Sequence, residues 1–282
     1  MYQPLAPIPT IPAPWWPADF QAFSALHALT VAILALGMGA SCVLGRRWRG
    51  TAREWRLRVF WSTFTITWTV LATVWYFLPR QFDPMESWPL HVCDIAVWVA
   101  PLALLTQNRW LRTVLYFFGI GLSTQAFATP VVEEGPAGTR FWLFWVGHTQ
   151  IVGSAIYDLV VLGYRPRFRD LLAAVGTLIA YAALVTPINL GFGVNYGYIG
   201  NAEPARETLV TRLGPWPWRL VPMFGLAVGV FVAAWGVWAL VGLLSRRGSR
   251  AQGPDAGSTP DPLPSNPTEA AGESLGDENP RA

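Results

Sequence analysis

The sequence has 282 residues, of which 52% are hydrophobic and only 13% charged, and its formal net charge is +3. Soluble globular proteins carry roughly a quarter charged residues, so this composition excludes an ordinary soluble domain. All 20 lysine and arginine positions are arginines, and most lie in short segments between apolar runs, which argues against a nucleic-acid-binding surface.

Long apolar runs recur along the chain, and runs of about 18 or more residues can cross a bilayer as helices. We place seven spans at about 20–44, 57–78, 90–106, 110–129, 141–163, 171–190 and 220–244. Helices satisfy their own backbone hydrogen bonds in lipid, and the runs lack the alternation of barrel strands. The predicted fold is an all-α bundle of seven transmembrane helices, a multi-pass protein of the cell membrane.

The segments around the transmembrane domain (20–244) set its orientation. Residues 1–19 are proline-rich with no basic residue, so we expect an extracytoplasmic segment and a first span that is retained. Residues 245–282 have little to bury, which predicts a disordered cytoplasmic tail. Fourteen arginines lie on the side of this tail and five in the alternate loops. The positive-inside rule therefore predicts an outside N-terminus and a cytoplasmic C-terminus.

Polar side chains of five spans fall in the predicted outer half of the membrane, where each is costly. They are His27, His91, Cys93, Asp94, Thr124, Gln125, His148 and Asn189. The inner half offers few polar groups. The cluster predicts either a polar cavity that opens to the outer leaflet or hydrogen bonds that pin the helices together.

Cys93 and His148 are the pair with chemistry of their own, because an imidazole can take the proton of a thiol and release a nucleophilic thiolate. The alternative is that Cys93 only fills space in the core. His91 and Asp94, three residues apart, can share one helix face. Asp94 either orients an imidazole or faces water at the helix N-terminus.

The other members of the cluster have equally open assignments. His27 either belongs to the cavity or keeps its tip in interfacial water. Thr124 either serves the cavity or bonds its own helix backbone. Gln125, Thr124 and Asn189 are the candidates to stabilise an oxyanion.

Several other features limit cofactors and partners. Cys42 and Cys93 fall near opposite membrane faces, too far apart for a disulfide. We find no zinc-ligand spacing and no phosphate-binding glycine loop, so we expect neither a metal nor a cofactor. Gly225 and Gly229 form a small-xxx-small spacing that favours close packing or a homodimer.

Four stretches together resemble the YwaF-like family of bacterial membrane proteins over about residues 22–244. They are Leu90-His91-Val92-Cys93-Asp94, Thr129-Pro130, Phe144 to His148, and Asn195-Tyr196. That family looks related to the eukaryotic transmembrane-protein-164 acyltransferases, described as moving a fatty acyl chain onto lyso-ether phospholipids. The resemblance implies Cys93 as nucleophile and His148 as general base. For His91, Asp94, Asn195 and Tyr196 it implies membership of the motif and no role.

Two functions follow from these features. The first is a lipid acyltransferase or thiol lipase that acts on a phospholipid or lysophospholipid. The alternative is a transporter or ligand-binding protein without covalent chemistry, against which stands the lack of an inverted repeat. A scaffold without chemistry is the third possibility.

Overall fold

The computed structural model describes residues 17–202 and 210–251. These residues are helical with connecting loops and form no strand, apart from an isolated bridge between Asp19 and Glu134. The all-α prediction is therefore confirmed. Our predictions for residues 1–16 and for the tail beyond Ala251 lie outside the described residues. The chain divides into two compact units, Met1–Val241 and Gly242–Ala282, and the contacts discussed below lie in the first.

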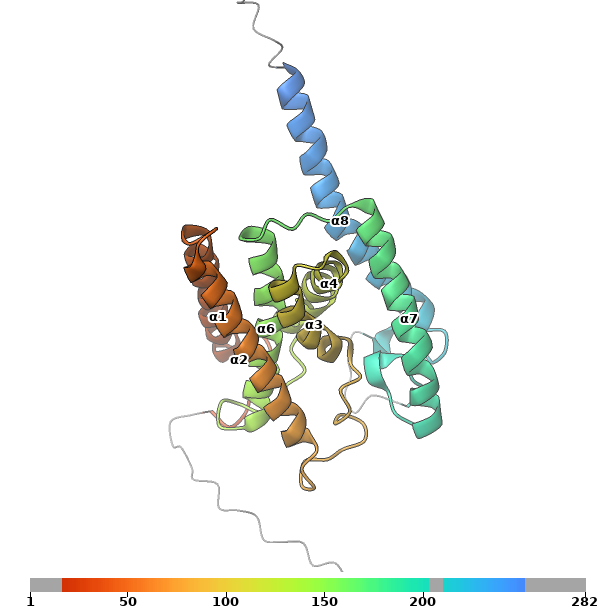
Figure 1. Ribbon diagram of the computed structural model, residues 1–282. Helices are drawn as coiled ribbons and strands as arrows, with labels where there is room; N and C mark the ends of the chain where they lie inside the picture. Colours follow the sequence, from red (N-terminus) through yellow and green to blue (C-terminus); the bar gives the residue numbers. More distant parts are fainter. Residues whose placement is uncertain (1–16, 203–209, 252–282) are drawn as a thin grey trace, which may run out of the picture. The chain divides into compact units, whose positions relative to one another are not determined.

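Seven helical segments occupy the positions of the seven predicted spans (Figure 1). The segments are α1 (Ala25–Arg47), α2 (Ala52–Tyr76), α3 (Val92–Thr106), the run formed by α4 (Arg109–Val114), η1 (Leu115–Ser123) and α5 (Gln125–Ala128), α6 (Thr139–Val160), α7 (Phe168–Phe192) and α8 (Leu220–Ala251). Two short 3₁₀ turns, η2 (Tyr196–Tyr198) and η3 (Thr211–Leu213), lie between α7 and α8.

Three helix ends differ from the expected boundaries by five residues or more. α1 begins at Ala25 and not near residue 20. α2 begins at Ala52, five residues before the predicted position, so Arg53 and Arg56 lie in the helix and not in a loop. α8 continues to Ala251, beyond the expected end near residue 244. Both extensions carry arginines, which a hydropathy reading assigns to loops because a charge in lipid is costly.

The fourth predicted span is not one regular helix. Its middle, η1, is a π-helix, and the hydroxyls of Ser123 and Thr124 donate to the carbonyls five residues earlier, those of Phe118 and Gly119. η1 packs closely on α6: a Cβ at Gly119 would lie 3.2 Å from the Cβ of Ala155. π-helical turns are uncommon and are often found near functional sites.

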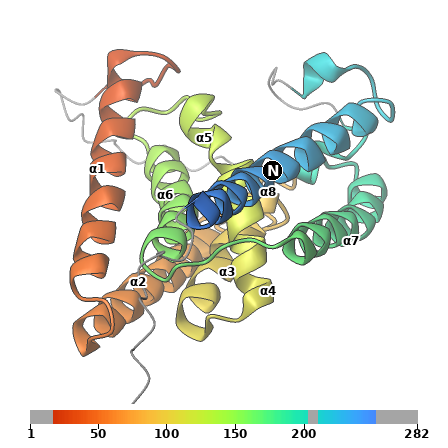
Figure 2. The ribbon, with the colours of Figure 1, turned by 90° about the horizontal axis from the view of Figure 1, so that it is seen from above.

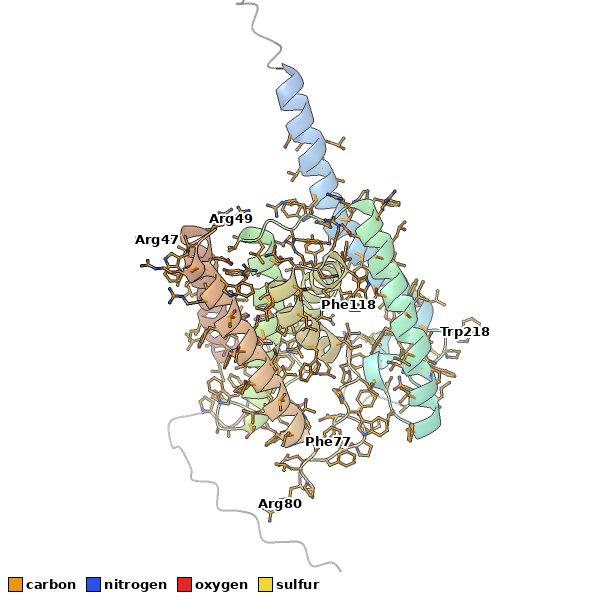
Figure 3. The ribbon with its side chains drawn as sticks, viewed as in Figure 1. Arg47, Arg49, Phe77, Arg80, Phe118 and Trp218 are labelled. Carbon is orange, nitrogen blue, oxygen red and sulfur yellow. The ribbon has the colours of Figure 1, made fainter. Side chains whose placement is uncertain are left out.

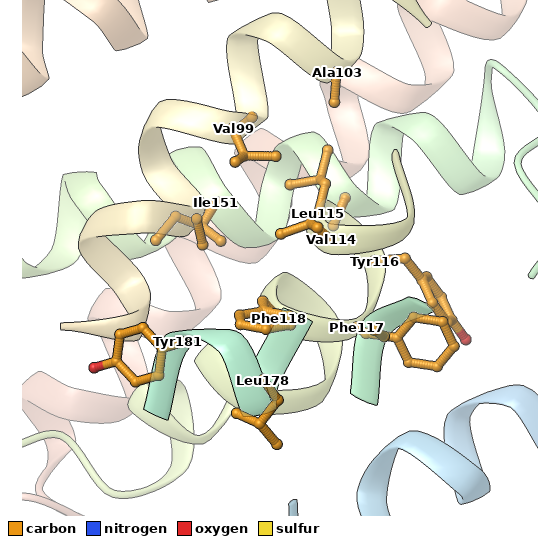
Figure 4. Close-up of a cluster of buried hydrophobic side chains, with 14 of the residues drawn as sticks. Val99, Ala103, Val114, Leu115, Tyr116, Phe117, Phe118, Ile151, Leu178 and Tyr181 are labelled. Atoms are coloured by element: carbon orange, nitrogen blue, oxygen red, sulfur yellow. The ribbon is translucent and has the colours of Figure 1, made fainter. Parts of the chain in front are cut away.

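Figures 1 and 2 show α3 and α6 at the centre of the first unit, with α1 and α2 on one side and α7 on the other. The main core cluster joins α3, η1, α6 and α7, and Figure 4 shows its members Val99, Phe118, Ile151 and Leu178. Lipid tails are as apolar as these side chains, so dispersion and close fit hold this core more than the hydrophobic effect does.

The outer surfaces of three helices are apolar and exposed. Leu36 of α1, Leu184 of α7 and Val221 of α8 are each more than 60% exposed. By length and composition, α1, α7 and residues Leu220–Ser245 of α8 can cross a membrane, while α3 is apolar but shorter. Seven crossings and their orientation stay a prediction.

The half that we expected to face the cytoplasm is richer in buried polar groups than predicted. Arg58 Nε lies 2.8 Å from Glu54 Oε1, and Arg58 Nη1 donates to the carbonyl of Leu104 at 2.9 Å. Tyr157 donates its hydroxyl to Glu54 Oε1 at 2.9 Å. The expectation of few polar groups was wrong, because Glu54 fell before the predicted start of the second span at residue 57 and was not counted as a buried group.

Candidate functional site

The N-terminus of α3 holds three residues of the predicted site. His91 is the N-cap residue, and its backbone N–H donates to Asp94 Oδ2 at 2.9 Å. A carboxylate in the first helical turn satisfies an N–H group that the helix leaves unpaired, and the helix dipole favours its charge. Asp94 thus caps α3 and fixes the start of the helix just before Cys93.

The imidazole of His91 is oriented by the loop after α7. Its Nδ1 accepts the N–H of Gly197 at 3.3 Å, and its ring packs edge-on against Tyr196 with 5.0 Å between centroids. Because Nδ1 is an acceptor, the neutral ring carries its proton on Nε2. His91 therefore presents a hydrogen-bond donor.

His148 of α6 has the opposite tautomer. Its Nδ1 lies 2.8 Å from the carbonyl oxygen of Phe144, which can only accept, so Nδ1 carries the proton. The Nε2 lone pair of the neutral ring is then free to take a proton. The Phe144 ring packs on the imidazole, with 4.4 Å between centroids. The structure gives Nε2 of His148 no partner among the residues that it describes.

Cys93 and His148 lie on α3 and α6, two helices that pack against each other. Cys93 is a half-buried free thiol that packs against the core cluster, one helical turn before Ala96 and Val97 of that cluster. His148 lies one turn before Ile151, which packs in the same cluster. The two histidines, His91 and His148, also lie close enough to interact electrostatically.

Tyrosines from two further helices surround these groups. Tyr76 at the end of α2 and Tyr181 of α7 both lie within electrostatic range of Cys93 and Asp94. Tyr181 also donates its hydroxyl to the carbonyl of Leu90 at 2.8 Å. The candidate site is therefore bounded by α2, α3, α6, α7 and the loop after α7.

The side chain of Asn189, a predicted oxyanion donor, bonds the backbone of the loop after α7. Its side chain is fully buried, and its Oδ1 and Nδ2 bond the N–H and the carbonyl of Tyr196, both at 2.9 Å. Asn195 likewise bonds Gly200 N–H and the Ala202 carbonyl. These amides hold the backbone of the loop.

Tyr196 connects this loop to the segment before α3. Its fully buried hydroxyl donates to the carbonyl of Pro84 at 2.6 Å and accepts the N–H of Trp88 at 3.0 Å. Burial, the largest effect, raises the pKa of Tyr196 to about 12, so the phenol keeps its proton and remains a donor. The Asn195-Tyr196 motif thus positions His91 from outside the helix bundle.

Replacing Asn189 with leucine is expected to destabilise the protein, because two buried backbone groups of Tyr196 lose their partners at about 1–3 kcal/mol each. Thermal unfolding of the purified protein in detergent measures this loss. Asn201→Leu, an exposed residue of the same loop, is the matched control. Equal melting temperatures of the two variants would contradict the role of Asn189.

Three predicted site residues lie elsewhere. The buried His27 accepts the N–H of Phe23 on Nδ1 and bonds the carbonyl of Phe127 through Nε2 at 3.0 Å, so it ties α1 to α5. Thr124 is exposed and bonds its own helix backbone, and Gln125 is exposed beside it.

A group of buried polar side chains between α2 and α6 escaped the sequence analysis. The side-chain amide of Gln150 is fully buried, and neither it nor the buried hydroxyls of Ser62 and Thr65 have a partner among the residues that the structure describes. Bonds from Tyr157 to Glu54 and from Trp61 to Ser154 show that the helices run antiparallel. Thr65 lies one helical turn after Trp61, and Gln150 lies one turn before Ser154. Antiparallel packing therefore brings Thr65 opposite Gln150.

These long apolar helices around a bundle with buried polar groups define an α-helical membrane protein. The family model of the TMEM164 family matches residues 22–238, and the chain belongs to that family. No curated protein and no solved structure matches the chain. The assignment to the bacterial YwaF-like branch stays a prediction.

Proposed function

We propose that this chain is a membrane-embedded lipid acyltransferase, or a thiol lipase, with Cys93 as nucleophile and His148 as general base. The observation that carries the proposal is the bond from His148 Nδ1–H to the Phe144 carbonyl. It leaves the Nε2 lone pair available as a base on α6, the helix that packs against α3, which carries Cys93. The resemblance of the motifs to acyltransferases supports the same assignment.

The proposed reaction has two half-reactions. In the first, the Cys93 thiol gives its proton to His148 Nε2 while Sγ attacks the ester carbonyl carbon of a phospholipid. The carbon–oxygen ester bond breaks, the proton passes to the leaving alkoxide, and an acyl-thioester remains on Cys93. In the second, Nε2 takes the hydroxyl proton of a lysophospholipid, or of water, as its oxygen attacks the thioester. The carbon–sulfur bond breaks, and the proton returns to Cys93.

His91, two residues before Cys93, is the donor that we propose for the oxyanion of both tetrahedral intermediates. Its Nδ1 is occupied by Gly197, so its Nε2–H is the free donor. Removing one such donor typically lowers kcat about 100- to 1000-fold. Asn189, Thr124 and Gln125, the candidates from sequence, are engaged with backbone or exposed.

The membrane arrangement is part of the proposal. Seven helical segments at the predicted spans support a multi-pass membrane protein. The arginine distribution supports an outside N-terminus and an inside C-terminus. This orientation places Cys93 in the outer half, where a lipid can enter without leaving the bilayer. Gly225 and Gly229 of α8 have open space beside them, which leaves room for a second copy in a homodimer.

The test is to trap the thioester. The purified full chain is incubated with phospholipid that carries a radiolabelled acyl chain, and label on the protein is measured before and after hydroxylamine. We expect hydroxylamine-sensitive label on the wild type and on Cys42→Ala, the matched cysteine control, and none on Cys93→Ala. Equal label on folded Cys93→Ala would contradict the proposal, as would loss of label in Cys42→Ala alone.

The second candidate function is transport, favoured by the unpartnered Ser62, Thr65 and Gln150 between α2 and α6. These groups lie between the candidate site and the Glu54–Arg58 pair, as a polar pathway requires. Proteoliposomes with the pH dye pyranine inside test this path. Proton flux that Cys93→Ala retains and that Thr65→Val/Gln150→Leu abolishes would establish it, and flux no faster than in protein-free liposomes would exclude it.

A further inference from the structure

A basic hollow lies at the turn that joins α1 to α2, far along the chain from the candidate site. Its volume is about 510 Å³, and it is lined by Arg47, Trp48, Thr51, Ala52, Arg53 and Arg56. Figure 3 labels Arg47 and Arg49 at this end of α2, with Phe77 and Arg80 at the opposite end. The hollow therefore belongs to the end of the bundle that the arginine distribution assigns to the cytoplasm.

The charge of the hollow is uncompensated within the lining. Three guanidinium groups line it and no carboxylate does. The nearest acidic residue along the chain, Glu54, is buried and bonded to Arg58 and Tyr157. Among the residues that the structure describes, no ion pair engages Arg47, Arg53 or Arg56, and like charges this close favour a bound anion.

The donors of the hollow suit a phosphate group. Guanidinium groups bind phosphate oxygens through pairs of parallel hydrogen bonds. The hollow also includes Ala52 and Arg53, the first residues of the 25-residue α2, where helical N–H groups lack intrahelical partners and the dipole favours an anion. The Thr51 hydroxyl is already donated to the Trp48 carbonyl, so it adds no donor.

The surface beside the hollow is apolar. Val43 and Leu44 of α1 and Val59 and Phe60 of α2 are exposed. Such side chains accommodate acyl chains while Trp48 suits the level of the headgroups. A free phosphate ion would contact only the basic residues, whereas a phospholipid would contact both the basic residues and the apolar surface.

We propose that this hollow binds the headgroup phosphate of an anionic phospholipid. The site lies at the opposite end of α2 from Tyr76, which borders the candidate site, so it is separate from the acyl-transfer chemistry. A lipid held there fixes the turn between α1 and α2 against the membrane surface. The proposal does not depend on the proposed function.

Native mass spectrometry of the purified full chain in detergent tests the proposal. Dioleoyl-phosphatidylglycerol and dioleoyl-phosphatidylcholine are titrated separately into the wild type and into Arg47→Gln/Arg53→Gln/Arg56→Gln. Each basic residue near an anionic lipid strengthens its binding electrostatically. Removing three of them should therefore raise the Kd for phosphatidylglycerol at least about tenfold in the triple variant. Phosphatidylcholine should bind both proteins equally and more weakly.

Two further variants keep the outcome unambiguous. Arg80→Gln/Arg169→Gln/Arg212→Gln removes three exposed arginines elsewhere and should bind phosphatidylglycerol like the wild type. Arg47→Lys/Arg53→Lys/Arg56→Lys keeps the charge and should recover part of the binding. Equal phosphatidylglycerol binding by wild type and the glutamine triple variant would overturn the proposal. Displacement of phosphatidylglycerol by equimolar inorganic phosphate would overturn the choice of a lipid.

Discussion

Replacing His148 with glutamine is expected to slow acylation of Cys93 by about 100- to 10,000-fold, the usual contribution of a general base. The wild-type imidazole offers an Nε2 lone pair because its Nδ1–H is donated to the Phe144 carbonyl. A glutamine amide has no comparable base. Quenched-flow measurement of labelled thioester on Cys93 gives the rate directly.

His27→Gln is the matched control for this experiment. Both ring nitrogens of His27 bond backbone groups, one of them the carbonyl of Phe127, so this histidine holds α1 to α5. We expect His27→Gln to lower the melting temperature while it keeps the wild-type acylation rate. A folded His148→Gln protein that acylates at the wild-type rate would show that His148 is not the base.

Replacing Arg58 with methionine is expected to destabilise the protein by about 3–5 kcal/mol, because it leaves the Glu54 carboxylate buried without its counter-ion. Both side chains are less than 10% exposed. The arginine also donates to the Leu104 carbonyl, so the change removes a link between α2 and α3 as well. Thermal or denaturant unfolding of the purified protein in detergent measures the loss.

The double variant Glu54→Gln/Arg58→Met removes the buried charge and should regain much of the lost stability. Leaving one buried charge without its counter-ion destabilises a protein more than removing both members of the ion pair. Arg80→Met, which alters an exposed arginine, should change stability by less than about 0.5 kcal/mol. Similar stability of Arg58→Met and the wild type would mean that water reaches Glu54 and the pair is not truly buried.

The apolar runs located all seven helical segments, because a helix is the simplest way to bury backbone in lipid. The start of α2 could not be predicted in the same way. The Glu54–Arg58 pair is tolerated inside the helix because Arg58 donates to the Leu104 carbonyl and Glu54 accepts from Tyr157, and both of these partners lie more than 40 residues away in the sequence. The same limit applies to η1, since hydropathy does not distinguish a π-helix from an α-helix.

The site could be predicted in part. The spacing of His91 and Asp94 indicated a shared turn, and the structure uses it to cap α3. The roles of His27 and Asn189 were hidden, because their partners are backbone groups that the fold alone brings near. Thr65 and Gln150 did leave a signal: Ser62, Thr65 and Thr69 recur at helical spacing on one face of α2.

The π-helix also bears on how the length of this chain can change. A π-helix winds more residues into each turn than an α-helix does, so η1 contains a local surplus of chain. A one-residue deletion between Leu115 and Ser123 can therefore be absorbed as an α-helical turn, whereas the same deletion within α3 would rotate every residue that follows. Ser123 and Thr124 would then change their backbone partners, while the Phe127 carbonyl would keep its bond to His27. Among members of the family, we expect length variation to be tolerated in this segment sooner than in any neighbouring helix.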